Sequence, residues 1–334
     1  MAQYIIRRLL ALIPVLIGVS IVVFLLIRMI PGDPVVVMLG ERARLEDVER
    51  VRREMGFDRP IYIQYIEWMG RVLRGDLGKS ILGYTQVMDE LKYRLPATIE
   101  MVLLGLFMGV IFGVGIGIIS ALKQNTWVDT SAMFVALIGV SMPIYWLALM
   151  LIYALAVNNR IFPPSQRLDV EFTLVRRTGF MMLDTLMMGD IRMFANAVWH
   201  LILPSIVLST VIMPILARLT RSSMLEVMRQ DYVRTARAKG LRENIIVVRH
   251  ALKNALLPVV TVVGLQLGGL LGGALLVETI FSWPGMGSWT YRAILSRDYP
   301  IVQAAVLASA TIYVFVNLFV DISYAYLDPR IRYR

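Results

Sequence analysis

The side chains that most often carry out chemistry are scarce in this chain. None of its 334 residues is a cysteine, so the sequence offers no thiolate nucleophile, disulfide or thiolate metal ligand. The two histidines, His200 and His250, are far apart and lack the spacing of metal ligands. No serine, histidine and carboxylate form a pattern of nucleophilic catalysis. We therefore predict that the chain is not an enzyme and holds no metal.

A glycine-rich segment, Gly75-Asp-Leu-Gly-Lys-Ser80, invites comparison with a phosphate-binding loop. That motif needs a glycine five residues before the second glycine, and Leu73 stands there. No strand and helix pattern surrounds the segment. We therefore expect no ATP site in this chain.

Three carboxylates, Glu100, Glu278 and Asp321, lie near the ends of apolar stretches. Glu100 follows Leu95-Pro96, which places it in the first turn of a helix, where the helix dipole favours an anion. Capping or ion pairing is expected for all three. Because no carboxylate or histidine falls in the middle of an apolar stretch, the pattern disfavours a proton relay.

The composition is that of a polytopic membrane protein. Hydrophobic residues make up 57% of the chain and the mean hydropathy is +0.67. A net charge of +10 is compatible with nucleic-acid binding, but no recognised motif accompanies it. Basic loops of a membrane protein explain the charge better. Six stretches are long and apolar enough to span a bilayer, at about residues 9–30, 98–122, 131–157, 198–218, 255–280 and 301–322.

Lysine and arginine counts set the expected orientation. With the N-terminus inside, the inner segments hold two basic residues near the N-terminus, Lys123, nine from Arg218 to Lys253 and three at the C-terminus. The two shorter outer loops hold seven. Both termini are therefore expected in the cytoplasm and the long loop at 31–97 outside. The first stretch lacks a cleavage site before Pro31 and is interpreted as a retained helix rather than a signal peptide.

Glycines recur with a period of four in two of these stretches, which places them on one face of each helix. The first set is Gly105, Gly109, Gly113 and Gly117, and the second is Gly264, Gly268 and Gly272. Such stripes let helix backbones approach closely. We expect a tight helical bundle.

Between the fourth and fifth stretches lies the charged segment 231–242, which cannot lie in lipid. Its phrase Arg234-Thr-Ala-Arg-Ala-Lys-Gly240, followed by Ala255-Leu-Leu-Pro258, resembles the cytoplasmic "EAA" loop of type I ABC importer permeases. Arg234 takes the Glu place, and Thr235 and Ala236 take the two Ala places. Ala255 replaces the consensus Ile, and the gap after Gly240 is longer than usual. Both departures resemble the peptide-permease branch.

The resemblance to the dipeptide and oligopeptide permease family extends over the whole chain. It includes the start at Tyr4–Leu10, the phrase Arg74–Ser80, the last outer loop at Thr279–Gly285 and the end at Asp328–Ile331. The segments Gly179–Thr185 and Arg221–Glu226 resemble the B-type subunit of dipeptide permeases.

This resemblance implies an all-α integral membrane protein with six transmembrane helices and the type I ABC importer permease fold. Residues 1–96 would form the first helix and long periplasmic loop, 97–327 the permease core and 328–334 a cytoplasmic tail. The implied partners are a homologous sister permease, two ABC ATPases, a peptide-binding protein and membrane lipid. No cofactor is expected in this chain, since the ATPase subunits would bind ATP and magnesium.

The resemblance also assigns a coupling loop at about 226–245, a short helix that docks on an ATPase subunit. Its small residues Ala236 and Gly240 are of the kind expected where such an element contacts a partner closely. The predicted coupling residues are Tyr232, Arg234, Thr235, Ala236, Arg237, Ala238, Lys239, Gly240 and Leu241. We expect Gly240 to adopt a left-handed conformation at a helix end.

Uncharged polar residues within the apolar stretches are candidates for lining a path, although hydrogen bonding between helices is an alternative role. They are Ser141, Thr210, Gln266 and Asn317. A neutral path suits a zwitterionic dipeptide, so dipeptides are the first expected substrate and short oligopeptides the second. Glutathione, nickel and haem importers share these phrases and remain alternatives. Two interpretations belong to other functional classes. One is a secondary transporter or channel, and the other is a structural subunit without a path.

Overall fold

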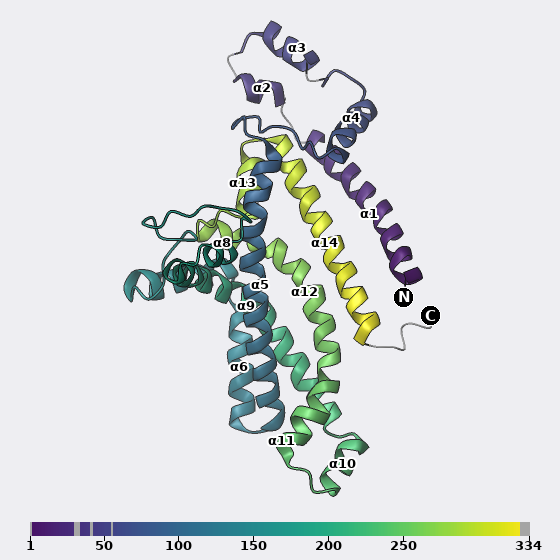
Figure 1. Cartoon of the computed structure of the whole chain (residues 1–334), viewed down its shortest axis with the longest axis vertical. Helices are drawn as coiled ribbons and strands as arrows, with labels where there is room; N and C mark the ends of the chain where they lie inside the picture. Colours follow the sequence, from purple (N-terminus) through teal and green to yellow (C-terminus); the bar gives the residue numbers. More distant parts are fainter. Residues whose placement is uncertain (1, 30–33, 41–42, 55, 328–334) are drawn as a thin grey trace. The chain divides into compact units, whose positions relative to one another are not determined.

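The computed structural model shows an all-helical protein (Figure 1). It describes residues 2–29, 34–40, 43–54 and 56–327. The predicted tail 328–334 and the side chain of Asp321 lie outside what is described. Within the described ranges there is no β-strand, and one isolated bridge joins Lys79 and Gln86. The predicted all-α fold class is confirmed.

The chain forms two compact units, the first from residues 1–96 and 285–315. Its core is an apolar cluster to which Val23 and Ile27 of α1, Trp289 of α13 and Ala305 of α14 contribute. The helices that lie in or enter this unit are α1 (Ala2–Met29), α2 (Pro34–Leu39), α3 (Leu45–Glu54), α4 (Ile61–Leu73), the start of α5 (Val87–Leu122), α13 (Met286–Leu295) and the first part of α14 (Tyr299–Leu327).

The second unit comprises residues 97–284 and 316–334. It contains most of α5, the end of α14 and every helix between α5 and α13. These are α6 (Trp127–Ser141), α7 (Ile144–Leu151), a π-helical turn (Ile152–Asn158), α8 (Met181–Met187), α9 (Ile191–Val227), α10 (Asp231–Ala238), α11 (Glu243–Ile245), a second π-helical segment (Ile246–Ala251) and α12 (Leu252–Ile280).

Five described helices are long and apolar enough to span a membrane, and a sixth span is possible if a bent pair of helices counts as one. The pair is α6 with α7 and the π-helical turn that follows it, so the stretch predicted at 131–157 is bent by 99° rather than straight. The break falls at Met142–Pro143, where Met142 is extended (φ −100°, ψ 136°). Proline lacks an N–H and disfavours a helical residue before it, which ends α6 there.

Helices α5 and α9 also extend beyond the apolar windows predicted for them. α5 begins at Val87, so Pro96 lies inside it and Glu100 is not in a first turn, contrary to the sequence prediction. α9 begins at Ile191, where Asp190 caps it by accepting hydrogen bonds from the backbone N–H groups of Arg192 and Met193. Hydropathy detects only the apolar part of a helix, and these helices continue past it.

The glycine stripe of α5 faces α9, which runs beside it (Figure 1). A Cβ atom added at Gly113 would lie 2.7 Å from the backbone oxygen of Met213, and one at Gly117 would lie 2.6 Å from that of Ala217. The expected close packing is therefore confirmed for α5. On α12 the stripe behaves differently. A Cβ at Gly264 would meet Val320 at 2.4 Å, but one at Gly272, or at the adjacent Gly269 or Gly273, would meet nothing within 4 Å in the described part of the chain.

Candidate functional site

The segment predicted to couple to an ATPase contains the short amphipathic helix α10. Val233 and Ala236, three residues apart, lie on the same face and are buried. They form a small apolar cluster with Ile246, and Met228 packs against it. The helix is thus fixed to the segments on either side of it by its own apolar face.

The C-terminal end of α10 has the geometry of a Schellman motif. Gly240 N–H donates to the carbonyl of Arg237 (2.9 Å), and Leu241 N–H donates to the carbonyl of Ala236 (3.3 Å). Gly240 has φ +76°, a backbone conformation that residues other than glycine rarely adopt. The predicted left-handed glycine at the end of this helix is confirmed.

The remaining predicted coupling residues form an exposed surface. Seven side chains are exposed, and they are Tyr232, Arg234, Thr235, Arg237, Ala238, Lys239 and Leu241. Ala236 differs, because it is only 7% exposed and packs inside the chain. The expectation that its small side chain faces a partner is therefore wrong. Its size matters instead for the approach of α10 to Ile246.

Charges on this surface are partly paired. Arg237 forms two hydrogen bonds with the carboxylate of Glu243, at 3.2 and 2.7 Å. That contact raises the pKa of Arg237 above its ordinary value, so it stays charged. Arg234 has a weaker exposed pairing with Asp231 at 3.4 Å, and Lys239 is exposed. The surface therefore presents fixed positive charge on a short rigid helix.

A hydrogen-bonded link joins α10 to the start of α12. The Tyr232 hydroxyl accepts a hydrogen bond from Asn254 Nδ2 (2.8 Å) and donates one to the carbonyl of His250 (3.4 Å). A displacement of α10 would therefore move the adjoining end of α12 through both apolar and polar contacts.

A polar cluster of Ser120, Asp129 and Arg221 ties the ends of three helices together. Arg221 on α9 donates two hydrogen bonds to the Asp129 carboxylate, at 2.8 and 2.7 Å. Ser120 on α5 also donates to Asp129, which lies in the first turn of α6. Such a bidentate arginine–carboxylate pair fixes orientation as well as distance. It holds α5, α6 and α9 in one arrangement at the end of α9 that leads into α10.

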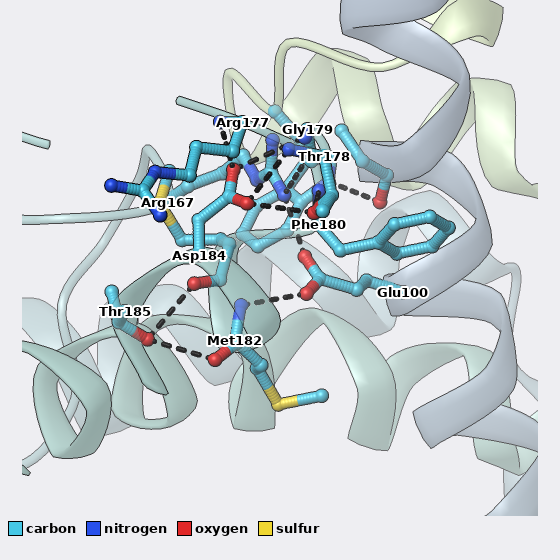
Figure 2. Close-up of polar contacts among 12 residues, drawn as sticks. Glu100, Arg167, Arg177, Thr178, Gly179, Phe180, Met182, Asp184 and Thr185 are labelled. Carbon is cyan, nitrogen blue, oxygen red and sulfur yellow. Dashed lines mark hydrogen bonds and ion pairs between the residues drawn. The ribbon is translucent and has the colours of Figure 1, made fainter. Parts of the chain in front are cut away.

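A second polar cluster fixes the connection between α7 and α9 onto α5 (Figure 2). Glu100 on α5 accepts a hydrogen bond from Arg167 at 2.5 Å and another from the backbone N–H of Met182 at 2.8 Å. Arg167 also donates to the carbonyl of Gly179 (3.1 Å). Both charged side chains are buried, so loss of either partner would leave a charge uncompensated. The expectation of an ion pair at Glu100 is confirmed.

Asp184 in α8 organises the loop that precedes it (Figure 2). Its carboxylate accepts hydrogen bonds from the side chain and backbone of Thr178 and from the backbone N–H groups of Arg177 and Gly179. Burial by itself would raise the pKa of Asp184, but these hydrogen bonds outweigh it and lower the pKa below its ordinary value. The carboxylate therefore stabilises the loop above its unfolded pKa, and this contribution is lost as the pH falls through the lowered value.

The end of α12 joins the same region of the second unit. Glu278 is fully buried and accepts a hydrogen bond from Thr98 on α5. Trp283 donates from Nε1 to the carbonyl of Ala97 (2.9 Å), and Arg167 lies over its ring at 5.6 Å from the centroid. The carboxylates of Glu100, Asp184 and Glu278 are thus all used to fasten segments to one another.

The four candidate path residues lie on four different helices. Ser141 and Thr210 donate to carbonyls of their own helices, those of Leu137 (3.0 Å) and Val207 (2.7 Å). Thr210 also lies against α6, since a Cβ at Gly139 would be 3.2 Å from it. Gln266 and Asn317 are half-buried. Their role in a path stays a prediction.

Sequence reasoning missed the partners in both polar clusters. Asp129 and Arg221 are separated by 92 residues and Glu100 and Arg167 by 67. A charge inside or beside an apolar stretch was the available signal, since such a charge needs a partner. The sequence does not show which charge meets which, because that depends on the helix packing.

The family described as "Binding-protein-dependent transport system inner membrane component" matches residues 113–333, and the N-terminal family of such membrane components matches residues 1–102.

The relatives include dipeptide transport system permease proteins DppB. That of Alkalihalophilus pseudofirmus is 48% identical over 333 residues, and that of Escherichia coli is 45% identical over 338. The di/tripeptide transport system permease protein DppB of Pseudomonas aeruginosa is 48% identical over 337 residues. Each alignment covers 100% of both chains. This chain therefore belongs to the family of inner-membrane components of binding-protein-dependent transport systems, the permease subunits of ABC importers.

Proposed function

We propose that this permease subunit imports dipeptides, with short oligopeptides as secondary substrates. The observation that carries the proposal is the full-length identity of 45–48% to three proteins named for dipeptide or di/tripeptide transport. The candidate path residues support it, because they offer dipoles without fixed charge. A zwitterionic dipeptide needs no net countercharge, whereas nickel would need ligating side chains or a chelator.

The energy would come from partner subunits. We propose a homologous sister permease, two ABC ATPases that bind ATP and magnesium, and a peptide-binding protein that delivers the substrate. The segment that resembles a phosphate loop supports the absence of an ATPase site in this chain. Gly75 and Gly78 both have positive φ, Ser80 donates to Asp298 (2.6 Å), and no helix begins between Leu73, where α4 ends, and Val87. In a phosphate loop, the serine would instead open a helix and contact magnesium.

The coupling step would be a rigid-body displacement. Closure of the ATPases on ATP would move α10, which is fastened to Ile246 by apolar contacts and to the start of α12 through Tyr232. The polar cluster of Ser120, Asp129 and Arg221 would transmit the movement from the end of α9 to α5 and α6. The spans would then turn the path outward.

We place both termini and α10 in the cytoplasm, on the basis of the lysine and arginine counts. A reporter enzyme that is active only in the cytoplasm is then expected to be active when it is fused after Arg334. A cysteine introduced in place of Gly83 is expected to react with a membrane-impermeant reagent added from outside. Reversed labelling would overturn the orientation and the coupling surface together.

Uptake measurements test the substrate. In cells that lack other peptide importers, restoring this permease with its partners is expected to recover uptake of a labelled dipeptide. Unlabelled dipeptides are expected to compete, and a binding-protein deletion in the same strain serves as the control. Recovery of nickel or haem uptake without dipeptide uptake would refute the substrate assignment and leave the family assignment intact.

A further inference from the structure

The first unit contains a large cavity whose walls carry an excess of positive charge. Its volume is about 1430 Å³, more than the roughly 300–1,000 Å³ of most small-molecule pockets. Six cationic side chains line it, and they are Arg28, Arg52, Arg59, Arg71, Arg74 and Lys79. Four carboxylates line it as well, and they are Glu54, Asp58, Glu67 and Asp76. The proposed transport function uses none of them.

Pairing leaves much of this positive charge available. Arg59 forms an ion pair with Glu67. Among the described residues, Arg71, Arg74 and Lys79 have no ion pair, and their side chains are exposed. These three charges come from the end of α4 and from the turn that follows it. An anion in the cavity would meet them without having to displace a carboxylate.

Arg28 adds a charge whose described contacts are all with neutral groups. It donates to the side-chain oxygen of Gln64 at 3.0 and 2.9 Å and to the carbonyl of Phe24 at 3.3 Å. Its guanidinium also lies over the Phe24 ring at 3.4 Å from the centroid. It is half-buried in the last turn of α1. A cation held in this way keeps its full charge for a further ligand.

The positions of α1 and α4 indicate the level of the cavity relative to the membrane. Arg28 ends the apolar span Ile6–Met29, which is the level of lipid headgroups. α4 packs on α1 through Tyr65 and Trp68, whose rings lie 5.3 and 5.5 Å from Phe24. The aromatic residues at the end of this span are typical of a membrane interface.

α4 also has the surface of a helix that lies in the plane of the membrane. Tyr62 and Leu73 fall on one stripe at helical spacing, outside the cavity lining, and are 67% and 81% exposed. Gln64 and Arg71 fall on the opposite face and line the cavity. An apolar stripe opposite a polar face is the pattern of an interfacial helix. The cavity therefore opens at the height where lipid phosphates lie.

We propose that this cavity binds the phosphate of an anionic phospholipid, such as phosphatidylglycerol, through Arg28, Arg71, Arg74 and Lys79. The ligand chemistry is a phosphate oxyanion, and the position at the end of a span favours a lipid over free phosphate. The lipid would brace α4 against the end of α1. The arrangement follows the general rule that clusters of basic side chains at the membrane surface recognise anionic headgroups.

The test uses the intact transporter complex in detergent, titrated with phosphatidylglycerol or phosphatidylcholine and examined by native mass spectrometry. The wild type is expected to bind phosphatidylglycerol more tightly than phosphatidylcholine. The double variant Arg71→Gln/Arg74→Gln removes two exposed charges that hold no described contact, so it is expected to fold normally. It is expected to weaken phosphatidylglycerol binding about thirtyfold. The matched control is Arg50→Gln/Arg53→Gln, which removes two exposed charges of α3 outside the cavity and is expected to change nothing.

A second variant and a second anion complete the test. Arg28→Gln is expected to weaken phosphatidylglycerol binding, and Arg28→Lys, which keeps the charge, is expected to weaken it less. Equal binding of the two lipids by the wild type, or an unchanged affinity in the double variant, would overturn the proposal. Displacement of the lipid by millimolar inorganic phosphate would assign the cavity to the free anion instead. Weaker binding of the peptide-binding protein with unchanged lipid binding would assign it to protein docking.

Discussion

Gly117→Val is expected to abolish the accumulation of folded permease. A Cβ atom at this position would lie 2.6 Å from the backbone oxygen of Ala217 and 2.6 Å from Thr220 Cβ, both on α9. Because one of these atoms belongs to the backbone of a helix, it cannot move aside as the end of a flexible side chain can. Overpacking of a core costs about 1–3 kcal/mol and occasionally more. We expect this valine to cost at least the upper end of that range.

The matched control is Gly115→Val on the same helix. An added Cβ there would meet nothing within 4 Å in the part of the chain that the structure describes. This control therefore makes the same change from glycine to a β-branched residue without the clash. The measurement is the amount of folded permease in detergent extracts of membranes, determined by size-exclusion chromatography before and after heating to a series of temperatures. We expect Gly115→Val to melt within a few degrees of the wild type. Equal melting of the two variants would show that α5 and α9 do not pack as described.

The close approach of α5 to another helix could be predicted from the sequence, but its partner could not. The period of four places Gly105 to Gly117 on one stripe, and a stripe of glycines predicts close backbones. α12 carries a similar stripe, yet a Cβ added at Gly272 would meet nothing within 4 Å among the residues that the structure describes. Periodicity reports the face of a helix and does not report what covers it.

The conformational effect of a proline on the residue before it explains the break in the third apolar stretch, which hydropathy does not detect. The window at 131–157 is apolar throughout and predicts a membrane span, but hydropathy alone does not show a bend within it. Pro143 removes a backbone donor and forces Met142 out of the helical region. Other prolines, such as Pro204 and Pro214, lie inside α9 without ending it. Whether a proline ends a helix depends on whether neighbouring groups satisfy the freed carbonyl, which only the tertiary structure shows.

In the coupling segment, the residues could be predicted better than the directions in which they point. The Arg234–Gly240 phrase placed a short helix ending in a left-handed glycine, and both features are present. The inward position of Ala236 was missed. Its spacing of three from Val233 is the signal that would have placed the two on one buried face.

Gly240→Val is expected to eliminate transport while leaving the spans inserted in the membrane. The backbone at Gly240 has φ +76°, and the turn it forms ends α10 through the Arg237 and Ala236 carbonyls. A β-branched residue in this conformation costs about 1–3 kcal/mol of local strain. α10 contains only eight residues and has a small apolar face, so such strain is enough to change the turn and displace Lys239 and Leu241.

The variants at Gly240 separate backbone strain from loss of contact. Among the described residues an added Cβ would meet nothing within 4 Å, so a loss of transport would not come from a clash with them. Asparagine tolerates the left-handed region better than other residues, so Gly240→Asn is expected to keep most of the uptake and Gly240→Ala an intermediate amount. The measurements are dipeptide uptake in cells and peptide-stimulated ATP hydrolysis by the purified complex. If all three variants lose transport equally, the exposed surface at Gly240 is a direct contact with the ATPase and the turn conformation is not what matters. If Gly240→Val keeps normal uptake and normal ATPase stimulation, this segment does not couple the two subunits.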